Sequence, residues 1–376
     1  MIKKTSFKGV SVIIPTWNRA HILAHMLKSL SKERARFGGE SEVIVVDSSD
    51  GNEKAQIEAA CVEYDANYVE GPQSVRKKRN IGVEQSRFDL LLFLDSDIEV
   101  SPGLFQAHVD AYIDRDYVGA AQGLTEFVGK GGFWWKVAEN SGLVDSFANA
   151  RKYPYQSWSI TNNLSVRRDV FYEIGCFWED FPFKLGGDDL EMSYRIAHAG
   201  YMIASTPDAV ALHTKETWDN QKALLDRTKR WGTMESLICD LHPELYKLVI
   251  PKNYVFEIPL IVVVLACAII KCQMAICAAF LLLALCVGRY MLECRKRGRF
   301  INPVHLFLAC GVNARYEFFR IKGFNKKGKR TAFMHAMIFN HHQVRGSYGE
   351  DAVRLYWMMS VYAATAVLMG VVANVI

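Results

Sequence analysis

Short apolar stretches of strand length alternate with longer stretches of helical periodicity along the first hundred residues. The strand candidates are residues 10–14, 42–46, 67–69 and 90–94. Between them, apolar positions recur at helical spacing in residues 20–30, 53–64 and 74–85. Apolar strands that alternate with helices are typical of a mostly parallel α/β sheet with helices on both faces.

Acidic residues stand where these predicted strands end. Asp47 closes the second strand, and Asp95 and Asp97 follow the strand at 90–94. Ligands of parallel α/β sheets bind beyond the carboxyl ends of the strands. We therefore expect the functional site at this edge. Beyond it the pattern is less regular, and we predict a helix at 190–198 and a short strand at 209–212.

The chain changes character near residue 250. Residues 254–292 are almost wholly apolar, which is too long for a single membrane-spanning helix of roughly 20 residues. The predicted spans are residues 254–270, 272–292 and 355–376, the last of which carries no charge. The chain thus divides into an α/β domain, residues 1–250, and an α-helical membrane region, residues 251–376, that includes a basic interfacial segment at 293–354.

Charge separates the two regions. The net charge is +5, but residues 251–376 hold 16 Lys or Arg and 5 Asp or Glu, so they carry +11 and residues 1–250 carry −6. Basic residues beside apolar spans remain on the cytoplasmic side. A hairpin at 254–292 would place the α/β domain there as well. We expect a multi-pass protein of the cell membrane that contacts membrane lipids through its basic segment.

Composition excludes several other classes. Half of the residues are hydrophobic and 23% are charged, which excludes a disordered or collagen-like chain. The nine cysteines include no CxxC pair, so neither a disulfide scaffold nor a zinc site is predicted. No secretory signal follows the N-terminal lysines. No basic patch with interleaved aromatics indicates nucleic acid as a partner.

Asp95-Ser96-Asp97 is the first candidate for chemistry. Two carboxylates just past a buried strand can bind a hard divalent cation such as Mg²⁺ or Mn²⁺, which prefers oxygen ligands and often keeps substrate phosphate as one of them. The alternative is a solvated strand end, because two acids at this spacing are common in turns.

Several motifs occur together in one order and resemble the family 2 glycosyltransferases, which have the GT-A fold. The resemblance covers roughly residues 8–235. Its motifs are SVIIPTWNR at 11–19, EVIVVD at 42–47, RNIG at 79–82, FLDSD at 93–97, NNLSVRR at 162–168, IGCF at 174–177 and GGDDLE at 186–191.

The resemblance implies an inverting transfer from a nucleotide sugar, with a UDP-sugar as the commonest donor, and a divalent cation, Mn²⁺ or Mg²⁺. The metal ligands that it implies are Asp97, Asp95 and His213. The residues that it implies for the nucleotide sugar are Pro15, Thr16, Asn18, Asp47, Arg79 and Asp95. The neighbouring Lys77 and Lys78 are expected on a solvated helix face.

The catalytic base is expected at Asp189 or Asp188. Asp189 aligns with the second acid of the acidic motif of the family, whereas Asp188 replaces its usual Glu. The substitution leaves open which of the two deprotonates the acceptor hydroxyl. Because both precede a predicted helix, capping of its N-terminus is the alternative role for either side chain.

Two aromatic motifs are candidates for the acceptor or the diphosphate. Residues 227–231 (RTKRW) resemble the QxxRW motif of processive polysaccharide synthases, in which Arg230 would meet diphosphate and Trp231 would stack on the acceptor sugar. An amphipathic helix at the membrane surface is the alternative. Trp134 and Trp135 follow a glycine run, and they suit either an acceptor platform or a buried aromatic cluster.

These observations predict a membrane-anchored inverting glycosyltransferase, an enzyme of hexosyltransferase type. Its acceptor would be a hydroxyl of a lipid-linked glycan or of another membrane-surface molecule. A processive polysaccharide synthase is the first alternative. A non-catalytic membrane scaffold with a degenerate transferase domain is the second.

Overall fold

The computed structural model describes residues 7–183, 186–248, 302–329 and 335–337, with the single positions 291, 295 and 298. These residues form two compact units. Unit 1 contains residues 7–130 and 144–217 of the described chain, and unit 2 contains residues 131–143, 218–248, 302–329 and 335–337. Each unit is described by itself.

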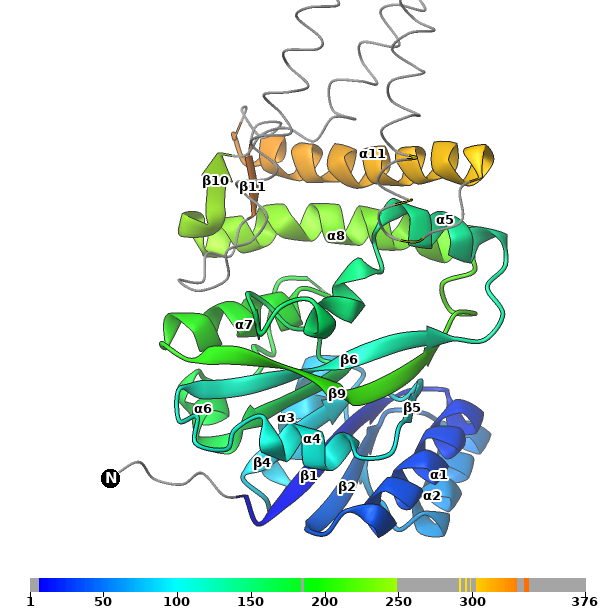
Figure 1. Ribbon diagram of the computed structural model, residues 1–376, viewed down its shortest axis with the longest axis vertical. Coiled ribbons are helices and arrows are strands. Elements are labelled where there is room, and N and C mark those ends of the chain that lie inside the picture. Colours follow the sequence, from blue (N-terminus) through cyan, green and yellow to red (C-terminus); the bar gives the residue numbers. More distant parts are fainter. Residues whose placement is uncertain are drawn as a thin grey trace, which may run out of the picture. The chain divides into compact units, whose positions relative to one another are not determined.

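A single nine-stranded sheet organises unit 1, in the order β3-β2-β1-β4-β8-β6-β9-β5, with β7 paired to β9 (Figure 1). The strands are β1 (Gly9–Thr16), β2 (Glu40–Asp47), β3 (Asn67–Glu70), β4 (Leu90–Leu94), β5 (Ile98–Val100), β6 (Val118–Val128), β7 (Tyr155–Gln156), β8 (Asn163–Arg167) and β9 (Met202–Thr214).

The sheet is mixed, which corrects the expectation of a mostly parallel one. Strands β3, β2, β1 and β4 run parallel, as does the β6–β9 pair. The pairings β4–β8, β6–β8, β5–β9 and β7–β9 are antiparallel. The expected strand at 209–212 is part of the longer β9, in which Pro207 and Asp208 interrupt the apolar pattern where the pairing with β6 shifts register.

Helices cover both faces of the sheet. The helices of unit 1 are α1 (Ala20–Arg36), α2 (Gly51–Glu63), α3 (Val75–Glu84), α4 (Leu104–Asp110), α6 (Arg168–Glu173) and α7 (Asp188–His198), with a 3-10 turn η1 (Asp145–Arg151). Alternate strand residues feed two separate cores. Val12 and Leu92 pack with α1, α2 and α4, whereas Ile13 and Phe93 pack with α3, α6 and α7.

Strand pairing brings the predicted site residues to one edge. Thr16 is the register partner of Asp47 across β1 and β2, and Ile13 pairs with Phe93 across β1 and β4. The carboxyl ends of these parallel strands therefore lie together, as the alternation of strands and helices predicted.

Unit 2 consists of α5 (Phe133–Ser141), α8 (Gln221–Leu241), the turn η2 (Pro243–Leu245), α11 (Pro303–Lys326) and the two-stranded pair β10 (Tyr246–Leu248) and β11 (His335–Met337). Helices α8 and α11 lie side by side (Figure 1). Their close approach requires glycine at Gly232, because a Cβ there would lie 2.4 Å from the Tyr316 carbonyl oxygen of the other helix.

The predicted membrane spans at 254–270, 272–292 and 355–376 lie outside the described residues, apart from position 291. Among the helices that are described, none combines the length and the apolar character needed to cross a membrane. Helix α11 falls inside the predicted basic segment at 293–354.

Candidate active site

Asp97 lies between an arginine and a histidine at the carboxyl edge of the sheet. One carboxylate oxygen, Oδ2, is 2.8 Å from Nη1 of Arg19, and the other, Oδ1, is 3.7 Å from Nε2 of His213. The Asp97 side chain is only 10% exposed. His213 reaches this position because β9 pairs with β5, where its register partner is Ile98, next to Asp97.

The ring of His213 is held in one tautomer. Its Nδ1 lies 2.9 Å from the backbone oxygen of Thr214. A carbonyl oxygen only accepts hydrogen bonds, so Nδ1 carries a proton, and Nε2 is the ring nitrogen that faces Asp97. A backbone acceptor on the far nitrogen is the usual support of a metal-binding histidine.

The pair of Asp97 and His213 fits a divalent cation. A carboxylate oxygen and an imidazole nitrogen are both common ligands of divalent cations, and here the two atoms face each other at 3.7 Å. Within the described part of the chain, no three His, Cys, Asp or Glu side chains gather closely enough to hold a metal by themselves. Phosphate and water would complete the coordination. Asp95 lies near both residues, its carboxylate contacts Arg79 at 3.3 Å, and its role as a metal ligand stays a prediction.

Arg79 joins the two acidic parts of the site. Its Nη2 contacts Asp95, and its Nη1 donates to Oδ2 of Asp188 at 2.8 Å. The guanidinium lies over the Phe177 ring, 5.3 Å from its centroid, which excludes water from one side. Partial burial raises the pKa of Asp95, Arg79 lowers it, and the nearby Asp97 raises it further.

Asp188 and Asp189 have different surroundings at the start of α7. Asp188 is buried and contacts two cations, Arg79 at 2.8 Å and Arg76 at 3.8 Å. Asp189 accepts a hydrogen bond from the Leu190 N–H at 2.9 Å, and no ion pair to it occurs among the residues that the structure describes. Burial and the neighbouring Asp188 raise the pKa of Asp189 to about 7. The charge of Asp188 is compensated by two arginines, whereas Asp189 has a pKa near neutrality.

A pair of glycines directs both acids into the site. Gly186 and Gly187 have φ values of 88° and 86°, a left-handed conformation that residues with a Cβ rarely adopt. Gly187 is the N-cap residue of α7, and no side chain caps that end with a hydrogen bond. Neither acid is therefore the N-cap residue itself, although the Asp189 carboxylate accepts from N–H groups of the first turn.

The predicted nucleotide residues surround the ends of β1 and β2. Pro15 is a buried residue of β1, and the buried Thr16 hydroxyl has no hydrogen-bond partner within the described structure. Asn18 is exposed with a φ of 49°, and its N–H donates to the Ser49 hydroxyl oxygen at 2.7 Å. The fully buried Asp47 in turn accepts from Ser49 at 2.7 Å. Asp47 thus holds the turn that would contact the base.

The sequence analysis missed three basic residues. Lys78 is 4% exposed and donates to the backbone oxygen of Thr16, so its expected place on a solvated helix face is wrong. Burial lowers the pKa of Lys78 to about 8. Arg76 is 5% exposed against Asp188, and Arg19 holds Asp97. The helical spacing of Arg76, Arg79 and the core residue Val83 was the available signal that one face of α3 is buried.

The four aromatic-motif candidates lie in unit 2. Asp219 fixes the start of α5 by accepting from the backbone N–H groups of Gly132 at 2.6 Å and Trp135 at 2.9 Å. Trp135 is buried, and Trp134 is half-buried. Trp231 packs on Trp218 with ring centroids 5.9 Å apart, and Nε of Arg230 is buried without a hydrogen-bond partner in the described part of the chain. Their roles toward acceptor or diphosphate stay predictions.

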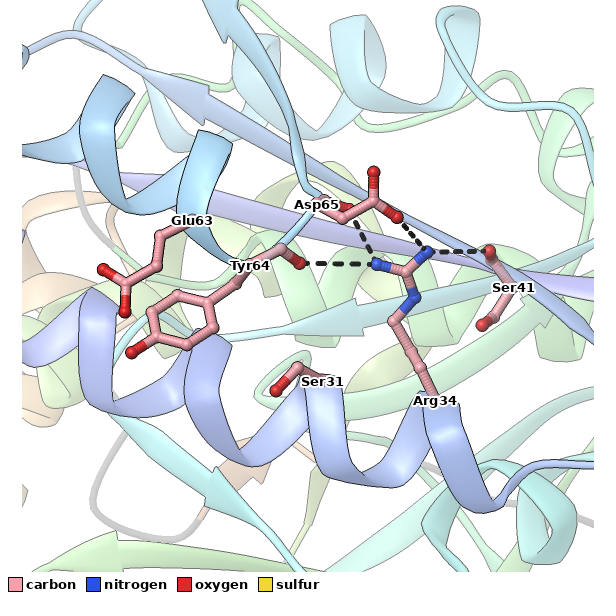
Figure 2. Close-up of a pocket in the computed structure, with 6 residues that line it drawn as sticks. All are labelled: Ser31, Arg34, Ser41, Glu63, Tyr64 and Asp65. Atoms are coloured by element: carbon pink, nitrogen blue, oxygen red, sulfur yellow. Dashed lines mark hydrogen bonds and ion pairs between the residues drawn. The ribbon is translucent and has the colours of Figure 1, made fainter.

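A pocket of about 400 Å³ lies elsewhere in unit 1 (Figure 2). Figure 2 shows that Arg34 spans it, bound to the Asp65 carboxylate at 2.9 Å and to backbone oxygens. Its wall at Ser41 belongs to the start of β2, whereas Asp47 ends that strand. A strand rises about 3.3 Å per residue, so this pocket is about 20 Å from the carboxyl edge. None of the predicted site residues lines it.

Comparison with known proteins shows similarity to glycosyltransferases. Residues 11–178 match the family described as Glycosyl transferase family 2. The chain is 26% identical over 251 residues to Chondroitin synthase from Escherichia coli, covering 56% of this chain and 35% of that protein. It is 29% identical over 215 residues to Glycosyltransferase AglE from Haloferax volcanii, covering 54% of this chain and 66% of that protein.

Among solved structures, the chain resembles the mannosyltransferase PcManGT from Pyrobaculum calidifontis in complex with GDP-Man and Mn²⁺, with a TM-score of 0.48, 16% identity, and coverage of 88% of this chain and 86% of that one. The matched region spans less than two thirds of each of the two relatives above. The sequence match and the relatives that are themselves glycosyltransferases agree on one class. Residues 11–178 therefore resemble a glycosyl transferase family 2 domain, and the comparisons support a glycosyltransferase as the enzyme class.

Proposed function

We propose that this protein is a membrane-anchored, metal-dependent inverting glycosyltransferase that moves a sugar from a UDP-sugar to a hydroxyl of a lipid-linked glycan. The observation that carries the proposal is the contrast between Asp188 and Asp189. Arg79 and Arg76 form ion pairs with Asp188, whereas Asp189 has no ion pair among the described residues and a pKa raised to about 7. A carboxylate that titrates near neutrality suits a general base.

The reaction needs a single displacement. Asp189 accepts the proton of the acceptor hydroxyl while the hydroxyl oxygen attacks the anomeric carbon from the face opposite the leaving diphosphate. The C–O bond to the diphosphate breaks as the new glycosidic bond forms, so the configuration at that carbon inverts. No covalent nucleophile is required. Asp188, which is paired with Arg79 and Arg76, raises the pKa of the neighbouring Asp189.

The donor would be held by residues of the strand ends. Asp97 and His213 would bind the cation, which when bound neutralises the leaving diphosphate. Arg79 fixes Asp95 beside this position and connects it to α7. Asp47 holds Ser49 and, through it, the turn at Asn18 that would contact the base.

Membrane association rests on the apolar segments and on the outward face of α11. Val304, Phe307 and Phe318 on this helix are 56%, 75% and 58% exposed. Lys322 and Lys326 follow them on exposed positions. An apolar helix face that ends in lysines suits a bilayer surface. Such an anchor would present the active site to a lipid-linked acceptor from the cytoplasmic side.

A nucleotide titration tests the donor site first. UDP, GDP, dTDP and CMP would be titrated into the full chain with and without Mn²⁺, beside an Asp97→Ala control. We expect metal-dependent binding of UDP that the substitution abolishes. Binding of none of the four by a folded sample would contradict the proposal and favour the non-catalytic scaffold.

Product analysis then tests the transfer itself. Incubation with UDP-sugars and lipid-linked acceptors should yield one added sugar with inverted anomeric configuration, read by NMR. A ladder of long products on a gel would instead identify a processive synthase, the alternative suggested by the RTKRW motif.

A further inference from the structure

Asp97 is already paired with a cation of the protein. We propose that Arg19 occupies this carboxylate until the donor arrives, and that it then passes to the diphosphate of the donor, so that metal and nucleotide bind cooperatively. The inference rests on the proposed function, because it assigns Asp97 to the metal. It gives a role to Arg19, the last residue of the motif at 11–19, to which the resemblance assigned none.

The geometry makes Arg19 the mobile partner of the pair. The Asp97 side chain is 10% exposed, whereas the Arg19 side chain is 45% exposed. The guanidinium Nη1 holds Oδ2 of Asp97 at 2.8 Å, and His213 faces the other oxygen, Oδ1. A divalent cation that takes both Asp97 and His213 as ligands must compete with this guanidinium for the carboxylate.

Electrostatic repulsion and attraction determine where the Arg19 guanidinium binds once the cation is present. A divalent cation on Asp97 repels the adjacent guanidinium, which loses its carboxylate at the same moment. The donor brings a diphosphate that the cation also binds, and this anion compensates both positive charges. The guanidinium fork suits phosphate oxygens as well as it suits a carboxylate. The nucleotide therefore offsets the charge repulsion between the cation and Arg19 that would oppose binding of the metal alone.

The chain also connects Arg19 to the nucleotide end of the site. Arg19 stands between two anchored positions, since the Asn18 N–H donates to Ser49 at 2.7 Å and the Ala20 N–H donates to Glu53 at 3.0 Å. Ser49 is bound by Asp47 at the end of β2. A ligand that contacts this turn acts on the backbone next to Arg19. Coupling between two ligands is reciprocal, so each should tighten the other.

Mn²⁺ binding to the full chain tests the proposal without turnover, with free aqueous Mn²⁺ followed by electron paramagnetic resonance. We expect Arg19→Met to bind Mn²⁺ about two- to fivefold tighter than wild type without nucleotide, the range for loss of one competing ion pair. Saturating UDP should tighten Mn²⁺ binding strongly in wild type. The factor by which UDP tightens Mn²⁺ binding should be smaller in Arg19→Met, because the variant has no competing guanidinium for the nucleotide to remove. Arg19→Lys, which keeps the charge, should remain close to wild type.

Arg34→Met is the matched control. It removes the 2.9 Å ion pair with Asp65 in the last turn of α1, the helix that Arg19 precedes, and leaves the carboxyl edge untouched (Figure 2). It should leave Mn²⁺ affinity unchanged with and without UDP. A change equal to that of Arg19→Met would overturn the proposal, because loss of any positive charge would then suffice to explain it.

Two further outcomes separate this inference from the proposed function. If Arg19→Met does not bind Mn²⁺ more tightly than wild type without nucleotide, while Asp97→Asn abolishes Mn²⁺ binding with UDP, the role of Arg19 is wrong and the metal site stands. If Asp97→Asn binds Mn²⁺ as wild type does, Asp97 is not the metal ligand, and both proposals fail together.

Discussion

Arg79 and Asp188 form an ion pair of 2.8 Å between side chains that are only 5% and 7% exposed. The same guanidinium contacts Asp95 at 3.3 Å. Helix α7 and the segment that follows β4 are therefore held together by one residue of α3. Because Asp188 is engaged in this way, we propose Asp189 as the acid at the start of α7 that takes part in proton transfer.

Asp189→Asn should abolish transfer and spare donor binding. The amide cannot accept the acceptor proton, and loss of a general base costs about 10²- to 10⁴-fold in rate. UDP affinity in the presence of Mn²⁺ should stay within about twofold of wild type. Asp180→Asn, an exposed carboxylate in the segment before α7, is the matched control and should retain activity. Near-normal turnover by Asp189→Asn would remove the base assignment.

The rate of transfer should rise with pH up to about neutrality. Asp189 must be ionised to act as a base, and its pKa is raised to about 7. Below that value kcat/KM should fall about tenfold per pH unit. The measurement is initial rate between pH 5 and 9 at saturating Mn²⁺. A profile flat from pH 5 to 8 would contradict the pKa of the base.

The same carboxyl should make stability depend on pH. Its pKa is raised from 3.8 to about 7 on folding, so its contribution is fully present below pH 4 and is lost as pH rises through 7. Asp189→Asn cannot ionise. It should therefore exceed wild type in stability by about 1 to 3 kcal/mol at pH 8, with the difference shrinking toward pH 4. Thermal unfolding at pH 4.5 and pH 8 measures both values, and a difference that is constant with pH would count against this account.

Arg79→Met should destabilise unit 1, because it leaves Asp188 buried with Arg76 at 3.8 Å as its remaining cation. Removing one partner of a buried ion pair costs about 3 to 5 kcal/mol, and the second arginine should reduce this to about 2 to 4 kcal/mol. Adding Asp188→Asn in the same chain should recover part of the loss. Melting temperatures of Arg79→Met, Asp188→Asn and the double variant complete a double-mutant cycle. Strictly additive changes in stability would mean that the two side chains are not coupled.

Gly232→Ala should loosen the packing of α8 against α11. The new Cβ would meet the Tyr316 carbonyl oxygen at 2.4 Å, and the helices must separate, at a cost of about 1 to 3 kcal/mol. Gly311→Ala on α11 is the control, because its Cβ would meet nothing within 4 Å. Alanine is the better helix former by about 1 kcal/mol, so the control should be neutral or stabilising. Circular dichroism melts compare the two, and equal effects would contradict the close approach.

The sequence by itself determined the strands of the N-terminal half and the acids at their ends. Apolar runs of strand length between helical patterns specify β1, β2, β3 and β4 through local burial alone. The order of the motifs then indicated the family. The pattern failed at β9, where Pro207 and Asp208 interrupt the apolar positions, although pairing with β6 holds the strand together.

Only the tertiary structure decided how the acids differ. Asp188 and Asp189 are adjacent in sequence and identical in chemistry, and the fold pairs Arg76 and Arg79 with the first and leaves the second half-buried. It likewise brings His213 and Arg19 to Asp97 through strand pairing and a turn. The physical reason is the same in each case. A pKa or a ligand set depends on which distant charges fold back onto a residue, and spacing along the chain carries no information about that.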